Sequence, residues 1–278
     1  MFNVNDPVTI DVSVHWVAVI VYVLATIANV WGVIFTKEKA VRLSYSLAYL
    51  GLAVHGVVLL YRWVATGHGP YMARYEILSS NAWVLLVLFL VLTKVYPKIK
   101  VASIVVFPAT FLLIALGLFF SPEMTRMPPS MRSIWLVLHV LFYKISVATI
   151  LVALAFSLIL ILKTRTSHKW LERLPSLDVV DIYAYRFAGF SFVFWAIAML
   201  AGSIWAYQLW GRFWGWDPVE TWSLITWGAF GMYLHLRRFF GWKGERAAYF
   251  YILCTFVSIV ALYFTPLLET SIHSEYFK

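Results

Sequence analysis

Long apolar runs set the strongest limit on what this chain can fold into. Hydrophobic residues fill 62% of the 278 positions and charged residues only 13%. The runs long enough to cross about 30 Å of hydrocarbon as helices number eight: 15–36, 41–64, 80–96, 101–120, 134–162, 188–209, 218–238 and 247–267. Because lipid offers no partners to backbone polar groups, the sequence predicts an all-α polytopic membrane protein with about eight transmembrane helices. No internal repeat or linker is visible, so we expect residues 1–278 to form a single transmembrane domain.

The basic residues predict the orientation of these helices. Fifteen of the 22 Lys and Arg lie in alternate connections: Lys37, Lys39, Arg42, Lys94, Lys98, Lys100, Lys163, Arg165, Lys169, Arg173, Arg186, Arg237, Arg238, Lys243 and Arg246. Such connections are cytoplasmic, so both termini and the connection between the sixth and seventh helices are expected on the non-cytoplasmic side. The net charge of +9 is then topological and does not indicate nucleic-acid binding. The N-terminal segment lacks a basic region and a cleavage site, so we expect no secretory signal.

Tryptophan is concentrated in the external connection and the helix turns on either side of it, residues 205–227. This stretch, WAYQLWGRFWGWDPVETWSLITW, holds six Trp, namely Trp205, Trp210, Trp214, Trp216, Trp222 and Trp227. Trp offers a large flat apolar face and one N–H donor, which suits a platform for a flat ligand or a membrane-interface belt. Belt residues are normally shared among many helix ends, so the crowding favours a platform.

The same stretch also contains the start of a helix. Asp217, Pro218 and Glu220 have the pattern of an N-cap, a proline at the first helical position and an acid at the third. We therefore predict that Asp217 caps the seventh helix and fixes the loop that carries Trp214 and Trp216. Two glycines in the loop, Gly211 and Gly215, would let the backbone lie close to a bound ring.

Three histidines are candidate iron ligands. His139 at the outer start of the fifth helix and His273 after the eighth lie on the tryptophan side of the membrane. Two neutral imidazoles can hold a six-coordinate haem iron, so the sequence predicts an external haem site. His235 lies 17 residues after Pro218, about 25 Å along the helix. It therefore serves either an inner haem or a lipid phosphate.

The remaining histidines and the single cysteine are less suited to a site. His15, His68 and His168 are expected to be solvated or interfacial. His55 lies in the middle of the second helix and needs a polar partner. Cys254 lies in an apolar run and is expected to pack in the core.

The segment WGRFWGWDPVETWSLITW resembles the tryptophan-rich WWD signature of haem-handling proteins in cytochrome c biogenesis. Among these proteins the CcmC type has six spans and the CcmF type is much larger. Eight spans, an outer N-terminus and the loop GHGPYMARYEILSSNAW resemble the CcsA (ResC) type of the System II pathway. The resemblance covers nearly the whole chain.

The resemblance implies an activity and a set of site residues. Together with a ResB/CcsB-type membrane partner, such a chain would move haem b, its substrate, to the external site and act as a cytochrome c haem lyase (synthase), promoting thioether attachment to the CxxCH motif of apocytochrome c. His139 and His273 would ligate the external haem iron and His235 an inner membrane haem, whose second ligand would come from the partner. No nucleophile is required from the chain. The haem-contacting residues would be Trp205, Trp210, Gly211, Trp214, Gly215, Trp216, Asp217, Pro218, Glu220, Trp222 and Trp227.

The resemblance also implies a location, and two other classes remain open. The membrane would be a bacterial inner membrane or a thylakoid membrane, and a chain without a fused ResB-like portion would depend on a separate partner. One alternative is a haem-binding electron-transfer subunit with two histidine pairs, although His68 lies in a loop and no second pair is visible. The other is a transport subunit without ligation activity. An axial methionine from Met124, Met127 or Met131 is less favoured.

Overall fold

The structure, a computed structural model, describes residues 6–268, apart from the side chains of Ser130 and Leu267. Over these residues the chain is helical and contains no β-strand. Seven helices or helical segments in this range are long and apolar enough to cross a membrane, which confirms the predicted class of polytopic membrane protein. The seventh predicted span, 218–238, is also a helix, α8 (Pro218–Phe239), but it does not reach the apolarity of the other seven. Its sequence contains Glu220, His235, Arg237 and Arg238, which explains the difference. The side on which the termini lie stays a prediction.

Contacts between residues divide the chain into two compact units, Met1–Pro128 and Pro129–Lys278. The expectation of a single domain also stays a prediction, and each unit is described by itself. The first unit contains α1 (Pro7–Ile34), α2 (Glu38–Thr66), α3 (Arg74–Val95), the 3₁₀ helix η1 (Pro97–Ala102) and α4 (Ser103–Gly117). The second contains η2 (Pro129–Met131), α5 (Ile134–Arg165), α6 (Lys169–Glu172), α7 (Leu177–Trp210), α8, α9 (Gly244–Ile259), a π-helical turn η3 (Val260–Phe264) and η4 (Thr265–Leu267).

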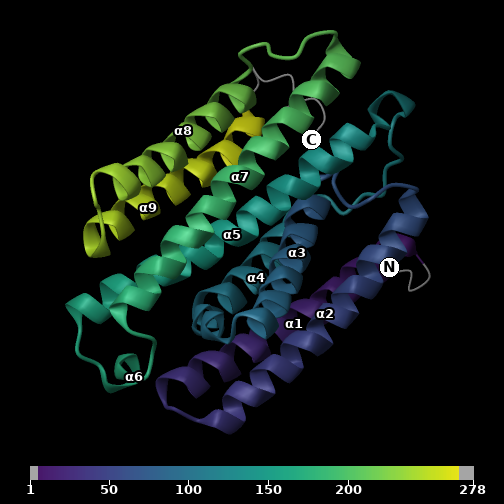
Figure 1. Cartoon of the computed structure of the whole chain (residues 1–278). Helices are drawn as coiled ribbons and strands as arrows, with labels where there is room; N and C mark the ends of the chain where they lie inside the picture. The colour runs from purple at the N-terminus through teal and green to yellow at the C-terminus, as the bar shows by residue number, and fades with distance from the viewer. Residues whose placement is uncertain (1–5, 269–278) are drawn as a thin grey trace. The chain divides into compact units, whose positions relative to one another are not determined.

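In the first unit α1 packs along α2 and against α4, and α3 packs against α4 (Figure 1). Close approach of α1 and α2 depends on Gly51, because a Cβ there would lie 2.5 Å from the Tyr22 ring. The core of this unit is unusually polar for a membrane protein. Buried polar residues recur on α1 at Asp11, His15, Tyr22, Thr26 and Asn29, a spacing that places them on one face of the helix.

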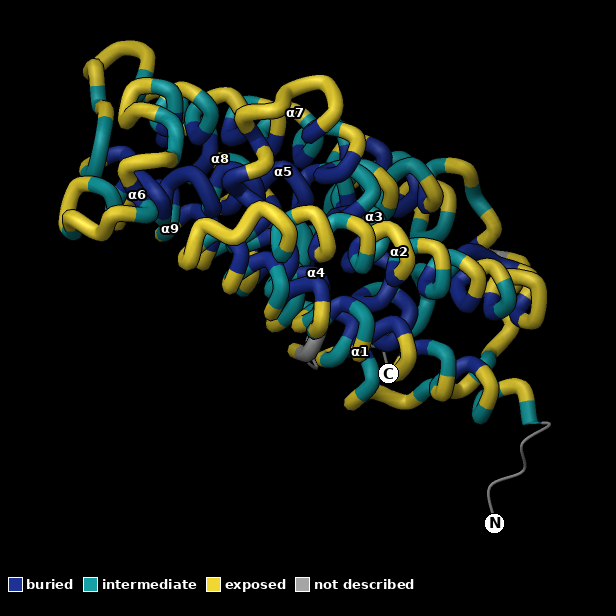
Figure 2. The backbone as a smooth tube through the Cα atoms, turned by 90° about the horizontal axis from the view of Figure 1, so that it is seen from below, coloured by how far each residue is buried: buried dark blue, intermediate teal, exposed yellow. Residues whose placement is uncertain are grey.

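In the second unit α5 and α7 pack along each other, and α8 packs against α7 and α9 (Figure 1). Two thirds of the most apolar window of α5 is buried, against one third for α7 (Figure 2). An ion pair closes one end of this unit, where Arg237 of α8 donates to both carboxylate oxygens of Asp181 on α7 at 2.6 and 2.7 Å. Asp181 also accepts from the backbone N–H of Gly244 at the start of α9, so the three helices are joined at one end.

Candidate functional site

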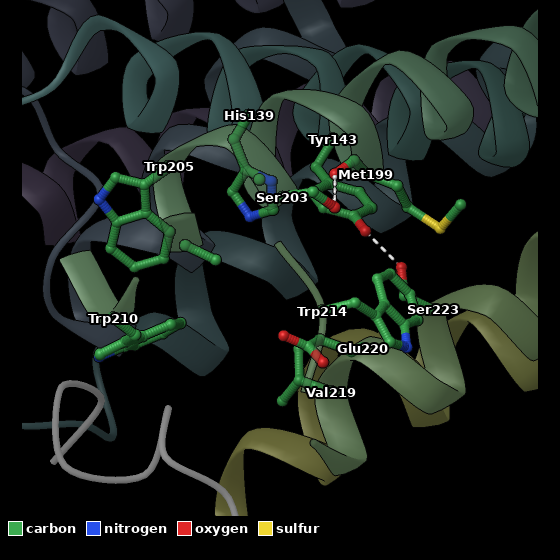
Figure 3. Close-up of a pocket in the computed structure, with 12 residues that line it drawn as sticks. His139, Tyr143, Met199, Ser203, Trp205, Trp210, Trp214, Val219, Glu220 and Ser223 are labelled. Carbon is green, nitrogen blue, oxygen red and sulfur yellow. Dashed lines mark hydrogen bonds between the residues drawn. The ribbon is translucent and has the colours of Figure 1, made fainter. Parts of the chain in front are cut away.

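A cavity opens in the second unit at the end of α7 and the start of α8 (Figure 3). It holds about 400 Å³ of space, including the part open to solvent. Its lining comes from α5, α7, the 211–217 loop and α8, and consists of His139, Tyr143, Met199, Gly202, Ser203, Trp205, Ala206, Trp210, Trp214, Val219, Glu220 and Ser223. Five of the residues predicted from the sequence are therefore brought together here: His139, Trp205, Trp210, Trp214 and Glu220.

His139 reaches the cavity from the first turns of α5, and its ring is oriented by α7. The Nδ1 atom lies 2.8 Å from the carbonyl oxygen of Ala198. Because a carbonyl can only accept, Nδ1 carries the proton, and in the neutral ring the lone pair is on Nε2. A hydrogen bond from one ring nitrogen to a backbone carbonyl is typical of histidines that bind a metal through the other nitrogen. The imidazole also lies nearly parallel to the Trp205 ring, with centroids 6.3 Å apart.

Gly202 is the position on α7 that allows this placement. A Cβ at Gly202 would lie 2.3 Å from Nδ1 of His139, so any side chain there would displace the ring. Gly202 could not be identified from the sequence, because nothing in its helical context indicates that a ring from α5 packs onto it.

Three tryptophans form much of the cavity wall. Trp205 is almost fully buried, and its ring meets that of Trp210 edge-on with centroids 5.2 Å apart. Trp214 closes the side toward α8 (Figure 3). Its Nε1 is buried and has no hydrogen-bond partner within residues 6–268. The wall therefore combines flat apolar faces with the buried donor of Trp214, whose acceptor is not supplied by residues 6–268.

The other three tryptophans do not line the cavity. Trp216 is 70% exposed and has a φ of +56°, a left-handed conformation that non-glycine residues seldom adopt. Its ring meets Trp214 edge-on at 5.9 Å. Trp222 is only partly buried, and Trp227 stacks on Phe192 of α7 with centroids 5.0 Å apart. The tryptophan stretch is thus not one continuous platform.

The predicted helix start at Asp217 is confirmed. Asp217 Oδ1 accepts from the N–H of Val219 at 2.8 Å, and Pro218 occupies the first helical position. Glu220 Oε2 accepts from the N–H groups of Asp217 at 3.2 Å and Gly215 at 2.7 Å. The capping box therefore ties the loop to α8 and fixes the residues beside Trp214.

Neither of the two loop glycines lines the cavity. Gly211 ends α7 with φ +72° and donates to the Tyr207 carbonyl, a helix C-cap that favours glycine. Gly215 lies beneath the guanidinium of Arg212, which a Cβ would meet at 2.1 Å. Their contribution in the structure is to shape the loop.

A hydrogen-bonded group in the cavity wall was also missed from the sequence. The hydroxyls of Tyr143 on α5 and Ser223 on α8 are hydrogen-bonded (Figure 3). The fully buried Trp195 of α7 donates its Nε1–H to the Ser223 carbonyl and hydroxyl at 3.0 and 3.1 Å. These contacts join α5, α7 and α8 at the cavity wall.

The remaining predicted residues lie elsewhere. His235 is exposed near the far end of α8 and contacts Phe239 and Phe240, with ring centroids 4.8 and 5.6 Å away. His273 lies outside the described residues. Cys254 is buried, as predicted, and its thiol donates to the Ala229 carbonyl. His168 is exposed, which confirms its solvated position.

The predictions for His15 and His68 were wrong. Both are buried, at 1% and 5% exposure. His15 is bonded to Ser79 of α3, 64 positions away, and His68 to the carbonyl of Thr125, 57 positions away. His55 has the polar partners that its position requires, Tyr22 and Ser79.

The comparison with known families agrees with this architecture. Residues 71–273 match the family described as Cytochrome C assembly protein, and the chain therefore belongs to this family of membrane proteins. Within it, the chain is of the CcsA type. It is 34% identical to the cytochrome c biogenesis protein CcsA of Chlamydomonas reinhardtii over 69% of this chain and 56% of that protein. It is 29% identical to CcsA of Synechococcus sp. strain CC9902 over 97% of this chain and 98% of the relative.

A solved structure shares the fold. It is that of the cytochrome c haem lyase CcmF, with a TM-score of 0.68 and 16% identity, covering 100% of this chain and 49% of that chain. The family and the seven membrane helices together define an integral membrane protein of cytochrome c biogenesis.

Proposed function

We propose that this chain holds haem at the cavity beside α7 and α8 and presents it for attachment to apocytochrome c. The observation that carries the proposal is His139, whose Nδ1–H is fixed by Ala198. The fixed tautomer makes Nε2 the ligating atom, at the edge of a cavity walled by Trp205, Trp210 and Trp214. A porphyrin suits such walls, since stacked aromatic faces and a neutral imidazole are what a flat metal complex needs. His273 is the second axial ligand in this proposal, and the haem is haem b.

The chemistry requires positioning more than catalysis by a side chain. Each thioether forms when a cysteine thiolate of the CxxCH motif adds to a haem vinyl group. A carbon–sulfur bond forms, the vinyl π bond breaks, and the other vinyl carbon takes up a proton from the thiol or solvent. His139 would hold the iron during this addition, and the histidine of CxxCH would then replace one ligand and release the product. The capping box at Asp217 and Glu220 would keep the Trp214 wall in place.

We further propose a path for haem across the membrane and a second membrane protein that takes part in it. The side bearing the cavity is non-cytoplasmic, as the distribution of Lys and Arg indicates. His235, about 25 Å along α8 from Pro218, serves a haem on its way from the cytoplasmic side. It is exposed beside Phe239 and Phe240, and a ResB/CcsB-type membrane protein would supply the opposite ligand. Ligation activity is expected only with that partner.

His139→Ala tests the external site. The chain is purified with its co-expressed partner, and its haem spectrum is recorded with and without added imidazole. We expect His139→Ala to lose or shift the haem absorption and to regain part of it with imidazole, because the added ligand occupies the vacated position. His168→Ala, at an exposed histidine outside the cavity, is the matched control and should keep the wild-type spectrum. A wild-type spectrum and wild-type covalent haem attachment in His139→Ala would overturn the proposal.

Variants of His235 and His273 separate the two haem positions. We expect His273→Ala to behave like His139→Ala. His235→Ala should lower the total haem content while the remaining haem keeps the spectrum of the external site. Unchanged haem content in His235→Ala would remove the inner position from the proposal and leave the external site intact.

A further inference from the structure

The core of the first unit holds a line of hydrogen-bonded titratable groups that haem handling does not use. His15 Nδ1 lies 2.9 Å from the carbonyl oxygen of Asp11, and His15 Nε2 lies 2.8 Å from Ser79 Oγ. Ser79 Oγ is also 2.8 Å from Nε2 of His55, whose Nδ1 is 3.3 Å from the Tyr22 hydroxyl. All five residues are at most 2% exposed. A single serine hydroxyl therefore connects two buried imidazoles.

The Asp11 carbonyl at the end of the line determines which atom donates and which accepts in each of the hydrogen bonds. The Asp11 carbonyl can only accept, so His15 must carry a proton on Nδ1 and, while neutral, must accept at Nε2. Ser79 then donates to His15 and accepts from Nε2–H of His55. Nδ1 of His55 in turn accepts from the Tyr22 hydroxyl. All four hydrogen bonds point from Tyr22 toward Asp11, an ordered chain in which each donor can pass its proton to the next acceptor.

At the Asp11 end of the line, two acidic side chains face one basic side chain, so one carboxyl group can take up a proton. Arg62 donates to Glu76 at 2.8 Å, to Asp11 Oδ2 at 3.0 Å and to the carbonyls of Pro122 and Glu123 at 2.9 and 2.7 Å. Two carboxyl groups thus share one guanidinium, so the formal charge of this buried group is −1 when both carboxyl groups are ionised. The other oxygen of Glu76 accepts from the N–H groups of Met72 and Ala73.

Asp11 Oδ1 is the place where this proton can go. It is buried, makes no hydrogen bond to Arg62 and lies 3.6 Å from His15 Nδ1, and the Tyr75 hydroxyl lies close to the same carboxyl group. Besides Asp11 on α1 and His55 and Arg62 on α2, the titratable groups facing His15 are Tyr75, with its ring centroid 5.0 Å away, and Glu76, both on α3. The segment after α4 contributes only the two carbonyls to this group. A charge unpaired inside a membrane unit is costly and commonly marks a functional path.

We propose that Tyr22, His55, Ser79, His15 and Asp11 form a proton relay in the first unit. A proton arriving at the Tyr22 oxygen displaces the hydroxyl proton to His55 Nδ1, the Nε2 proton of His55 moves to Ser79, and the Ser79 proton moves to His15 Nε2. His15 is then an imidazolium and can pass its Nδ1 proton to Asp11 Oδ1, so one proton enters and one O–H bond forms. From Asp11 to Tyr22 the relay spans 11 residues of α1, about 16 Å or half the hydrocarbon thickness.

The relay has a signature that a static hydrogen-bond network lacks. When His15 becomes cationic it donates to Ser79 from Nε2, so the Ser79 hydroxyl turns to His55. The proton of His55 must then be on Nδ1 instead of Nε2. Protonation of His15 is thus accompanied by a change of tautomer at His55, a ring that gains no net charge.

Nitrogen NMR of the full chain in lipid nanodiscs, labelled with ¹⁵N-histidine, measures this signature across a pH titration. We expect neutral His15 with its proton on Nδ1, neutral His55 with its proton on Nε2, and a switch of the His55 proton to Nδ1 with the same midpoint as the protonation of His15. In Ser79→Ala the switch should disappear. Thr93→Val, which removes another buried hydroxyl of α3 that bonds only its own helix, should behave like the wild type.

Tyr22→Phe provides a second variant if Ser79→Ala does not fold, because it removes the far end of the line and keeps the ring. His55 would then lack its acceptor for an Nδ1 proton, so its tautomer should no longer follow His15. The relay is overturned if His15 takes up a proton while His55 keeps its tautomer, if the switch persists in Ser79→Ala, or if neither ring changes over the pH range in which the protein stays folded.

Discussion

The buried histidines of the first unit and His139 of the second unit use their ring nitrogens differently. His15 and His55 have both ring nitrogens in hydrogen bonds with groups of their own unit. His139 has one nitrogen fixed by the Ala198 carbonyl, and its ring lies at the edge of a cavity. In the two proposals made above, the same residue type therefore serves proton transfer within one unit and ligand binding at a cavity of the other.

The same contrast extends beyond histidine. In the first unit Arg62 directs four N–H···O contacts to neighbouring oxygens. In the second unit Trp214 buries an N–H donor that finds no acceptor within residues 6–268. Satisfied polar groups stabilise a unit in the membrane, whereas an unsatisfied one beside a cavity indicates where a ligand supplies the missing partner. Four substitutions test this contrast.

Arg62→Met should have the largest effect on stability. It would leave Asp11 and Glu76 buried without their cation, a change that typically costs about 3–5 kcal/mol. The free energy of unfolding in mixed micelles measures it, with Arg165→Met as the control. Arg165 pairs with Glu245 at an exposed position, where an ion pair adds little. Equal losses of unfolding free energy in the two variants would show that the buried contacts of Arg62 stabilise the protein no more than the exposed ion pair of Arg165 does.

Gly202→Ala should weaken haem binding in the second unit and have little effect on the stability of the protein. The new Cβ would meet Nδ1 of His139 at 2.3 Å, so the ring must leave its bond to Ala198. We expect haem affinity to fall at least about tenfold, equivalent to about 1.4 kcal/mol. Stability should change little, since the preference of helices for alanine, about 1 kcal/mol, opposes the cost of about 1 kcal/mol or more for the displaced ring and its lost hydrogen bond.

Gly189→Ala is the matched control for this experiment. Gly189 lies on the same helix, and a Cβ there meets nothing within 4 Å. Haem titration of both variants should show a loss only for Gly202→Ala. If both variants bind haem like the wild type, the orientation of His139 by α7 does not matter for the site.

The features that could be predicted from the sequence are those that depend on local order. Apolar runs predicted the membrane helices, and the residues around Asp217 predicted the start of α8, because hydropathy and capping act over a few neighbouring positions. Helix α8 was predicted as a span like the others, although its polar residues make it less apolar than the other seven.

The features that could not be predicted depend on partners far along the chain. His15 looked interfacial because it follows a polar segment, but Ser79 buries it from 64 positions away. Gly202 resembles any helical glycine until the ring of His139 is placed upon it. Likewise Trp216 and Trp227 could not be distinguished from the cavity tryptophans. The loop turns at Trp216, which has a left-handed conformation, and Trp227 stacks on Phe192 of α7.

Asp217→Ala should have an intermediate effect, confined to the start of α8. Loss of the cap typically costs about 1 kcal/mol. We expect faster hydrogen exchange at the Val219 amide, which Asp217 accepts from, and a weakened Trp214 wall. Glu220→Gln keeps an oxygen that can accept from Gly215 and is the milder control. Exchange that speeds up equally in α1 would mean that the cap acts on the whole chain and not on the cavity wall.

Trp214→Phe should have the smallest effect on the stability of the ligand-free protein. Trp195→Phe is the reference variant. Both changes remove an indole N–H, but Trp195 loses two contacts with Ser223, whereas Trp214 loses none within residues 6–268. A broken buried hydrogen bond costs about 1–3 kcal/mol, so Trp195→Phe should lower the free energy of unfolding by that amount and Trp214→Phe by clearly less. With haem added, the order should reverse for binding, because the Trp214 donor can then reach an acceptor on the ligand. If Trp214→Phe destabilises the ligand-free protein as much as Trp195→Phe does, the N–H of Trp214 is already satisfied, and the contrast between the bonded donor of Trp195 and the donor of Trp214 does not hold.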